Sequence, residues 1–276
     1  MPRVDRSNGT ASRTAEKVER AADSTTAERL ARYGLASRGA VYLLMGVVAL
    51  LVAFGGSAEI DQKGVLQEVA EKPLGAFVVV VLAIGFACYA LWRVSEAAFG
   101  SATSDGTVAR IRSGARGLVY AFLTVSAVQV ALGARESQSA NQRGYTARVM
   151  EYAGGRWLVG VFGLAVLITG LVLAFNGLRA KFMDKIATDD ATPARLRATR
   201  RIGRVGVTAR GLVFALAGLF VVIAALQYDP SEAAGINGAL KELRATAYGP
   251  YLLGLVALGL GAFGVYGFAE ARHRRV

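Results

Sequence analysis

Apolar residues in this chain gather in six uninterrupted runs, and the charged residues lie in blocks between them. The runs are Ala40–Phe54, Leu74–Trp92, Leu118–Leu132, Leu158–Phe175, Leu212–Leu226 and Leu252–Phe268. A helix needs about 20 predominantly apolar residues, and no fewer than about 17, to cross the hydrocarbon core of a bilayer. The shorter runs reach this length when the residues before them are included, as in Leu35–Phe54. The pattern therefore predicts an all-α integral membrane protein with six transmembrane helices.

The overall composition supports the same class. The 276 residues are 54% hydrophobic and 19% charged, whereas a soluble domain is about 45–50% apolar and about 25% charged. This balance excludes a disordered chain, a coiled coil and an ordinary soluble enzyme. Residues 1–29 are polar and contain no apolar stretch typical of a cleavable signal peptide. We expect them to form a disordered cytoplasmic segment, so that the first span directs the chain to the membrane.

Lys and Arg are distributed unevenly between the two sides that six spans would create. Of the 32 in the chain, 24 lie before the first run, in the second and fourth connections, or in the C-terminal tail. Because cytoplasmic segments carry an excess of Lys and Arg, we expect both termini to be cytoplasmic. The net charge of +12 then belongs to a face held against anionic lipid headgroups. That interpretation accounts for the charge without nucleic acid binding.

Comparison of the chain with itself reveals three copies of one unit. An Arg-Gly pair opens each odd-numbered span, in Ser37–Tyr42, Ala115–Tyr120 and Ala209–Phe214. Downstream, the glycines Gly64, Gly144 and Gly238 each precede a second glycine by 11 residues, and a polar residue by 32 residues. Those second glycines are Gly75, Gly155 and Gly249, and the polar residues are Glu96, Asn176 and Glu270. Agreement at these spacings over three copies indicates an internal repeat.

Each unit comprises a span, a loop and a second span. The loops contain short amphipathic segments, which are Gly64–Val69, Gly144–Met150 and Gly238–Leu243. Since every unit has two spans, all three insert in the same orientation, and parallel copies of this kind are related by an axis along the membrane normal. We therefore expect three tandem parallel helix-pair repeats with pseudo-threefold symmetry. The predicted repeats cover residues 30–100, 108–182 and 202–276.

A basic cytoplasmic linker, residues 183–201, separates the second repeat from the third. It leads into the arginine-rich run Arg195–Arg204. We expect this run to form a basic amphipathic helix that lies on the inner leaflet.

The chain resembles a family of bacterial integral membrane proteins of unknown function, in which a transmembrane helix-pair domain occurs three times per chain. The resemblance covers roughly residues 30 to 273 and rests on the Arg-Gly openings and on the closing sequence Gly85–Arg93, which returns as Gly259–Gly267. The second repeat departs from this pattern, because Thr169, Val172 and Asn176 replace the expected aromatic and acidic residues. The resemblance implies the architecture and a place in the bacterial inner (plasma) membrane, and it implies no activity.

Six side chains of the repeat are candidates for interaction at the cytoplasmic ends of the spans. They are the arginines Arg38, Arg116 and Arg210 and, at the other end of each repeat, Glu96, Asn176 and Glu270. The two spans of one unit are antiparallel, so each arginine can meet the polar residue of its own repeat at one depth. An arginine inside the hydrocarbon region costs a few kcal/mol unless it is paired or reaches the interface. Two interpretations stay open: a structural clamp between helices, or a ring of charge that binds an anion or gates a pore.

Few other polar groups lie within the spans. The candidate intramembrane contacts are Gln129, Thr124 and Thr169, and we expect Gln129 to hydrogen-bond between helices. Glycines recur every seven residues at Gly163, Gly170 and Gly177 in the fourth span. In the sixth span Gly254 and Gly261, with Ala257 and Gly264, show the same spacing. This spacing places small residues on one helix face and predicts close helix packing.

The rare residues argue against catalysis. Cys88 is the one cysteine and His273 the one histidine, so the chain cannot form an intrachain disulfide or a metal, haem or iron–sulfur site from these ligands. We expect no catalytic centre, no cofactor and no metal. The sequence favours a non-catalytic structural, assembly or interaction role in the plasma membrane, with membrane lipids and a membrane protein as candidate partners. The alternative is a small-solute or ion transporter or channel that uses the axis between the three repeats.

Overall fold

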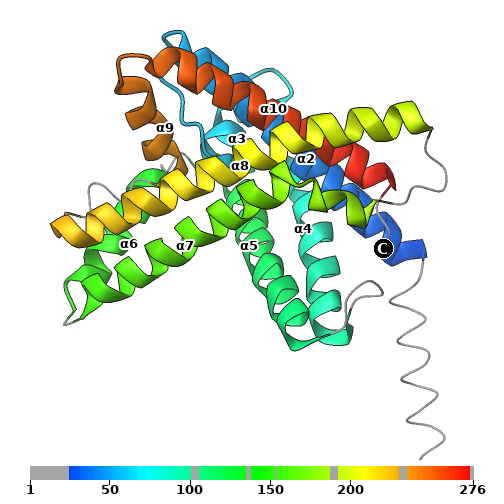
Figure 1. Ribbon diagram of the computed structural model, residues 1–276, viewed down its shortest axis with the longest axis horizontal. Coiled ribbons are helices and arrows are strands. Elements are labelled where there is room, and N and C mark those ends of the chain that lie inside the picture. Colours follow the sequence, from blue (N-terminus) through cyan, green and yellow to red (C-terminus); the bar gives the residue numbers. More distant parts are fainter. Residues whose placement is uncertain are drawn as a thin grey trace, which may run out of the picture.

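The computed structural model describes residues 25–100, 106–134, 138–152, 154–186, 192–229 and 235–273, and its regular elements are helices (Figure 1). The six long helices are α2 (Thr25–Ala53), α4 (Gly75–Phe99), α5 (Thr107–Ala131), α7 (Gly155–Leu178), α8 (Pro193–Gln227) and α10 (Gly249–His273). Each is long and apolar enough to cross a membrane, which confirms the predicted class and number of spans. Most of the predicted disordered segment lies outside the described residues. Its last residues, from Thr25, belong to helix α2.

One shorter helix connects the two spans of each repeat, at the place where the sequence predicts an amphipathic segment. These helices are α3 (Gln62–Ala70), α6 (Gln138–Met150) and α9 (Gly235–Ala245). In the first repeat, Asp61 caps the start of α3 by accepting a hydrogen bond from the backbone N–H of Gly64, at 2.9 Å. We name the end of the bundle that carries these three helices the loop end. The opposite end, with the termini and the connections between repeats, is the linker end.

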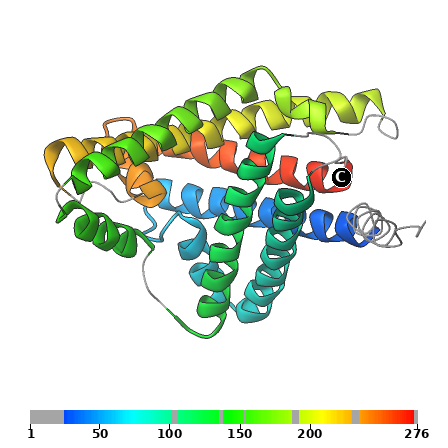
Figure 2. The same cartoon turned by 90° about the horizontal axis from the view of Figure 1, so that it is seen from below.

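The tightest helix pairs form across repeat boundaries. The most extensive packing is of α7 on α8, α10 on α2 and α4 on α5. These three helix pairs run in three different directions (Figures 1 and 2). Within repeats, α2 contacts α4 and α8 contacts α10 less extensively, while the described parts of α5 and α7 scarcely touch. The connections at the linker end favour antiparallel packing of α4 on α5 and of α7 on α8, whereas α2 and α10 pair without a connection between them. The long loops allow the two helices of one repeat to separate. The predicted threefold relation stays a prediction.

Glycines allow α7 and α8 to approach closely, as their seven-residue spacing predicts. A Cβ atom added to Gly163 would lie 2.8 Å from the backbone N of Val222. One added to Gly170 would lie 2.3 Å from the backbone N of Ala215. The arrangement is reciprocal, because a Cβ atom on Gly211 of α8 would lie 2.3 Å from the backbone N of Ala174. Small residues on both helices therefore form one seam along this hairpin.

The glycine prediction for the sixth span is right for only part of the set. Gly264 packs on α2, where an added Cβ atom would lie 2.5 Å from the backbone N of Leu43, and Ala257 is buried. At Gly254, by contrast, an added Cβ atom would meet nothing within 4 Å. Gly261 lies against α2 through its backbone, because a Cβ atom added to Gly46 of α2 would lie 2.8 Å from Gly261 N, although a Cβ atom on Gly261 itself would meet nothing within 4 Å.

The basic linker differs from its prediction. The run Arg195–Arg204 does not form a separate surface helix, because it is part of the continuous 35-residue helix α8. Pro193 begins this helix, at a position where proline is well tolerated. Gly203 and Gly206 do not interrupt it, since they are buried against Phe182 and Phe263 of neighbouring elements. A helix of this length measures about 52 Å and exceeds the roughly 30 Å hydrocarbon core, so its first part projects beyond the span.

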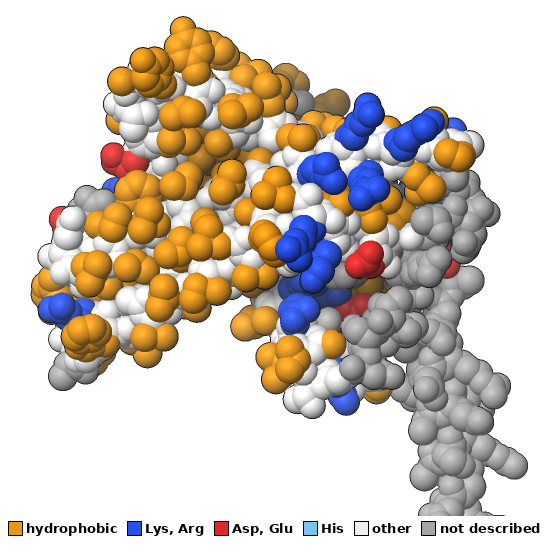
Figure 3. Space-filling view, viewed as in Figure 1, with side chains coloured by type: hydrophobic (Ala, Val, Ile, Leu, Met, Phe, Trp, Pro, Cys, Tyr) orange, Lys and Arg blue, Asp and Glu red, His pale blue; other side chains and the backbone are white. Residues whose placement is uncertain are grey.

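The surface has two distinct regions. Lys and Arg side chains gather over the linker end, including the projecting part of α8, whereas hydrophobic side chains cover the hairpins (Figure 3). Exposed aromatic residues mark the ends of the helices at the loop end, namely Tyr152, Trp157, Tyr228, Tyr248 and Tyr251. Such side chains are enriched where a membrane protein meets the headgroup region.

Candidate functional site

Charged and aromatic side chains meet where α2, α4, α5, α8 and α10 converge towards the linker end. We call this group the arginine–aromatic cluster. Its charged members are Arg38, Arg93, Arg210, Glu96 and Glu270. Its aromatic members are Tyr42, Tyr89, Trp92, Tyr120, Phe263 and Tyr266. The aromatic rings contact one another edge-to-face or tilted, at centroid distances from 4.2 to 6.0 Å, an arrangement that stabilises packing beyond the area it buries.

Arg38 and Glu270 form a buried ion pair between the first and third repeats. Arg38 Nη2 donates a hydrogen bond to Glu270 Oε2 at 2.6 Å, and both residues are less than 10% exposed. The guanidinium group also lies over the rings of Phe263 and Tyr89, at 5.4 and 5.8 Å from their centroids. The faces of these rings attract a cation. The cluster therefore neutralises an arginine that the sequence places inside a span.

This pairing corrects the within-repeat pairing expected from the sequence. Glu96, the predicted partner of Arg38, instead forms an ion pair with Arg93 of the same helix and accepts a hydrogen bond from Ser113 Oγ at 3.0 Å. The reason lies in the helix packing, since α10 lies much closer along α2 than α4 does. Glu270 therefore reaches Arg38.

Arg93 is a member of the cluster that sequence reasoning did not select. It is 3% exposed, donates two hydrogen bonds to the Tyr89 hydroxyl at 2.9 and 3.0 Å, and lies 4.1 Å from the centroid of the Trp92 ring. Its spacing from Tyr89 and Glu96 is four and three residues, and side chains at these spacings lie on one helix face. That local spacing could have identified it.

Arg210 belongs to the cluster through aromatic residues. Its Nε donates a hydrogen bond to the Tyr42 hydroxyl at 2.9 Å, and its guanidinium group lies 4.8 Å from the centroid of the Phe263 ring. Arg116 and Asn176, which the repeat aligns as a pair, are half-buried on α5 and α7. Because these two helices scarcely touch, the second repeat does not build a third copy of the cluster.

The departure of the second repeat from the repeat pattern accounts for this difference. Thr169 stands where the other repeats have Tyr89 and Phe263, and Val172 stands where they have Trp92 and Tyr266. The aromatic residues at these positions are buried in the cluster. Thr169 is exposed and donates its hydroxyl to the backbone oxygen of Ala165 in its own helix, at 2.7 Å. Helix α7 thus lacks the side chains that would seat it against α5.

The predicted intramembrane polar contacts are local. Thr124 Oγ1 donates to the backbone oxygen of Tyr120 at 2.8 Å, the same four-residue arrangement as at Thr169. Gln129 is exposed near the end of α5, so the structure does not place it between helices as expected. A position within one turn of the helix end allows its amide to reach the interface. The structure does not bring these three residues together.

Among the residues that the structure describes, no three His, Cys, Asp or Glu side chains form a group that could hold a metal ion. Cys88 is half-buried on α4. His273 Nδ1 lies 3.2 Å from the backbone oxygen of Ala269, one turn earlier in α10.

Comparison with known proteins agrees with the repeat. The model of a domain of unknown function, DUF1206, matches the chain three times, over residues 33–100, 111–180 and 205–274. The chain is also 29% identical over 253 residues to the uncharacterized protein YxxB of Bacillus subtilis strain 168, an alignment that covers 90% of this chain and 92% of the relative. No solved structure matches the chain. Because the three matches together cover most of its length, the chain belongs to the DUF1206 family, a family of unknown function with three helix-pair repeats per chain.

Proposed function

We propose that this multi-pass membrane protein has a non-catalytic structural or assembly role in the bacterial plasma membrane. In this proposal the linker end and both termini face the cytoplasm, and the basic side chains of that end hold anionic lipid headgroups. A partner membrane protein would then dock on the same lipid-stabilised scaffold. The excess of Lys and Arg at the linker end supports this orientation.

One observation carries the proposal against transport: the place where the repeats meet is filled by side chains. Tyr42, Tyr89 and Phe263 are at most 2% exposed there, and Arg38 faces their rings and the Glu270 carboxylate. A transporter needs a polar pathway, and its ionisable residues usually line a water-filled cavity. An arginine with a buried carboxylate and aromatic neighbours is better suited to clamping helices together.

The projecting part of α8 supports the choice of anionic lipids as partners. It carries five arginines, Arg195, Arg197, Arg200, Arg201 and Arg204, all of them exposed. A basic residue near an anionic membrane surface contributes about 1 kcal/mol of attraction. Several arginines on one helix therefore give this end a strong preference for anionic headgroups.

The proposal is tested by purifying the protein in mild detergent, identifying what accompanies it, and reconstituting it into vesicles. We expect retained anionic phospholipid, together with any partner protein, and no solute flux above that of empty vesicles. The double variant Arg200→Gln/Arg201→Gln should retain less anionic lipid at an unchanged melting temperature. The matched control, Lys72→Gln/Lys241→Gln, removes two exposed charges at the loop end and should retain as much as the wild type.

Two results would overturn the proposal. The first is solute flux through reconstituted vesicles that the variant Arg38→Gln changes while the protein stays folded. The second is a protein that purifies without lipid or partner and whose α8 variant behaves like the control.

A further inference from the structure

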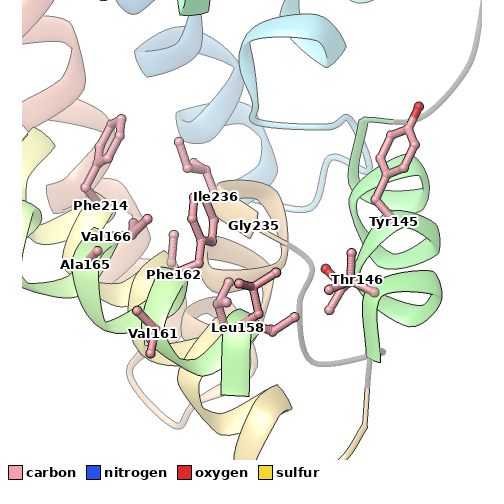
Figure 4. Close-up of a pocket in the computed structure, with 14 residues that line it drawn as sticks. Tyr145, Thr146, Leu158, Val161, Phe162, Ala165, Val166, Phe214, Gly235 and Ile236 are labelled. Carbon is pink, nitrogen blue, oxygen red and sulfur yellow. The ribbon is translucent and has the colours of Figure 1, made fainter. Parts of the chain in front are cut away.

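An apolar pocket of about 770 Å³ lies at the loop end, beside the second repeat. Four helices bound it: α6, α7, α8 and α9 (Figure 4). Its walls include Leu158, Val161 and Phe162 of α7, Phe214 and Val221 of α8, and Ile236 of α9. A volume of this size is in the range of about 300–1,000 Å³ that small-molecule sites occupy.

The pocket exists because the second repeat does not close. In the first and third repeats the second helix packs on the first, as α4 on α2 and α10 on α8, whereas α7 scarcely touches α5. The face of α7 that lines the pocket consequently stays open, and Leu158, Val161 and Phe162 are 64–68% exposed. Within a bilayer, an open apolar face of this kind is covered by acyl chains or by another protein.

The depth of the pocket distinguishes these two occupants. Its lining on α7 runs from Leu158 to Val166, and its lining on α8 from Phe214 to Val221. Eight residues of helix rise about 12 Å, which is close to the thickness of one leaflet, about half of the 30 Å hydrocarbon core. In addition, α6 and α9 bound the pocket at the loop end. A transmembrane helix must cross the whole core, whereas an acyl chain ends within its own leaflet.

Basic charge on α6, the helix that contributes Tyr145, Thr146 and Val149 to the pocket, fits the headgroup of such a lipid. Helix α6 contains Arg143 and Arg148, both exposed, and no acidic residue within its bounds. Trp157 next to the pocket is exposed, and the Arg156 guanidinium lies 5.0 Å from the centroid of its ring. Aromatic and basic side chains together are typical of the level at which lipid phosphates lie.

From these observations we propose that the pocket binds an acyl chain of a phospholipid from the leaflet at the loop end, with the phosphate beside Arg143 and Arg148. This site is separate from the basic surface of the linker end, and it does not depend on the role proposed above. It would anchor a lipid between the second and third repeats, where α6 and α9 meet.

A phosphatidylglycerol with a photoactivatable diazirine in its acyl chain tests this proposal. The protein is placed in lipid nanodiscs that contain the probe, illuminated, and digested to map the adducts. We expect adducts concentrated on residues 158–166 and 214–221. Ala165→Trp, at an exposed position on the pocket wall, should reduce them by about fivefold or more because the indole would project into the pocket and obstruct the acyl chain. Ala121→Trp places the same side chain on the exposed face of α5 and should leave the adducts unchanged.

Removing the charge of α6 with Arg143→Gln/Arg148→Gln should lower labelling by about tenfold to thirtyfold, because each of the two arginines contributes about 1 kcal/mol of attraction. Adducts spread equally over α5 and the pocket would overturn the proposal, because they would indicate bulk lipid. Unchanged labelling in folded Ala165→Trp protein, or a protein cross-linked within the pocket in native membranes, would do so as well. If Ala165→Trp protein does not fold, Val161→Trp from the same wall takes its place.

Discussion

At the scale of single residues, the cluster shows three ways of accommodating an arginine at the edge of a membrane. Arg38 forms an ion pair with the buried carboxylate of Glu270. Arg93 donates hydrogen bonds to the Tyr89 hydroxyl and forms an ion pair with Glu96. Arg210 donates a hydrogen bond to the Tyr42 hydroxyl. Aromatic rings contact all three guanidinium groups. The sequence identified Arg38, Arg210 and both carboxylates from the repeat spacing. It could not identify their partners, because one spacing fits a partner in the same repeat and a partner in another.

The buried ion pair predicts a large effect of removing one charge. Glu270→Gln should lower the free energy of unfolding by about 3 kcal/mol, since it leaves the buried Arg38 without a counter-charge. The control is Glu68→Gln, because the Glu68–Lys72 pair lies at the surface at 2.8 Å. The hydrogen bond with Glu68 raises the pKa of Lys72, but solvent screens this exposed pair, so losing it should cost much less stability than losing the buried pair. Thermal melting in detergent compares the two variants, and equal melting temperatures would show that the Arg38–Glu270 pair does not stabilise the fold.

At the scale of helices, the sequence predicted which helix faces carry small residues better than it predicted where helices begin and end. The seven-residue recurrence in α7 is a local property of one helix, so it could be read before any partner was known. The continuity of α8 could not be, because charges and glycines between Arg195 and Gly211 are typical of a break. In the structure, contacts from Phe182, Phe263 and Ala174 bury those glycines and keep the helix intact.

The glycine seam predicts that one added methyl group separates two helices. Gly170→Ala should lower the free energy of unfolding by about 1–3 kcal/mol, because the new Cβ atom would lie 2.3 Å from backbone N of Ala215. Gly254→Ala serves as the control, with nothing within 4 Å of its Cβ atom, and should be neutral or stabilise by up to about 1 kcal/mol. Melting temperatures that fall equally would contradict the seam.

The continuous helix α8 predicts a long distance between two spin labels. Labels at Arg197 and Leu226, both exposed, lie 29 residues apart on one helix, which corresponds to about 43 Å. Pulsed electron paramagnetic resonance in a Cys88→Ala background measures this distance. A much shorter distance would indicate that the arginine-rich part folds back onto the membrane surface.

At the scale of the molecule, the three repeats are joined by pairing across their boundaries. The first and last helices, α2 and α10, form one of the three tight helix pairs, so the C-terminal end of α10 lies beside the start of α2 (Figure 1). Hydropathy and spacing predicted six spans, three connecting helices and four charged members of the cluster, namely Arg38, Arg210, Glu96 and Glu270, because those features are local in the sequence. They could not predict which helices pair, since that depends on packing between units. The second repeat packs differently from the other two. The absence of the aromatic residues at Thr169 and Val172 is the feature of the sequence that indicates this difference.

The central claim is that Arg38 of the first repeat pairs with Glu270 of the third and closes the space between the repeats. Exchange of charges tests it most directly, through the melting temperatures of two double variants. Arg38→Glu and Glu270→Arg should each destabilise the protein, and the combined variant Arg38→Glu/Glu270→Arg should recover most of the loss, because coupled neighbours are not additive. Arg38→Glu/Glu96→Arg should recover nothing. Recovery in the second double variant and not in the first would show that the repeats pair internally, and would contradict this account.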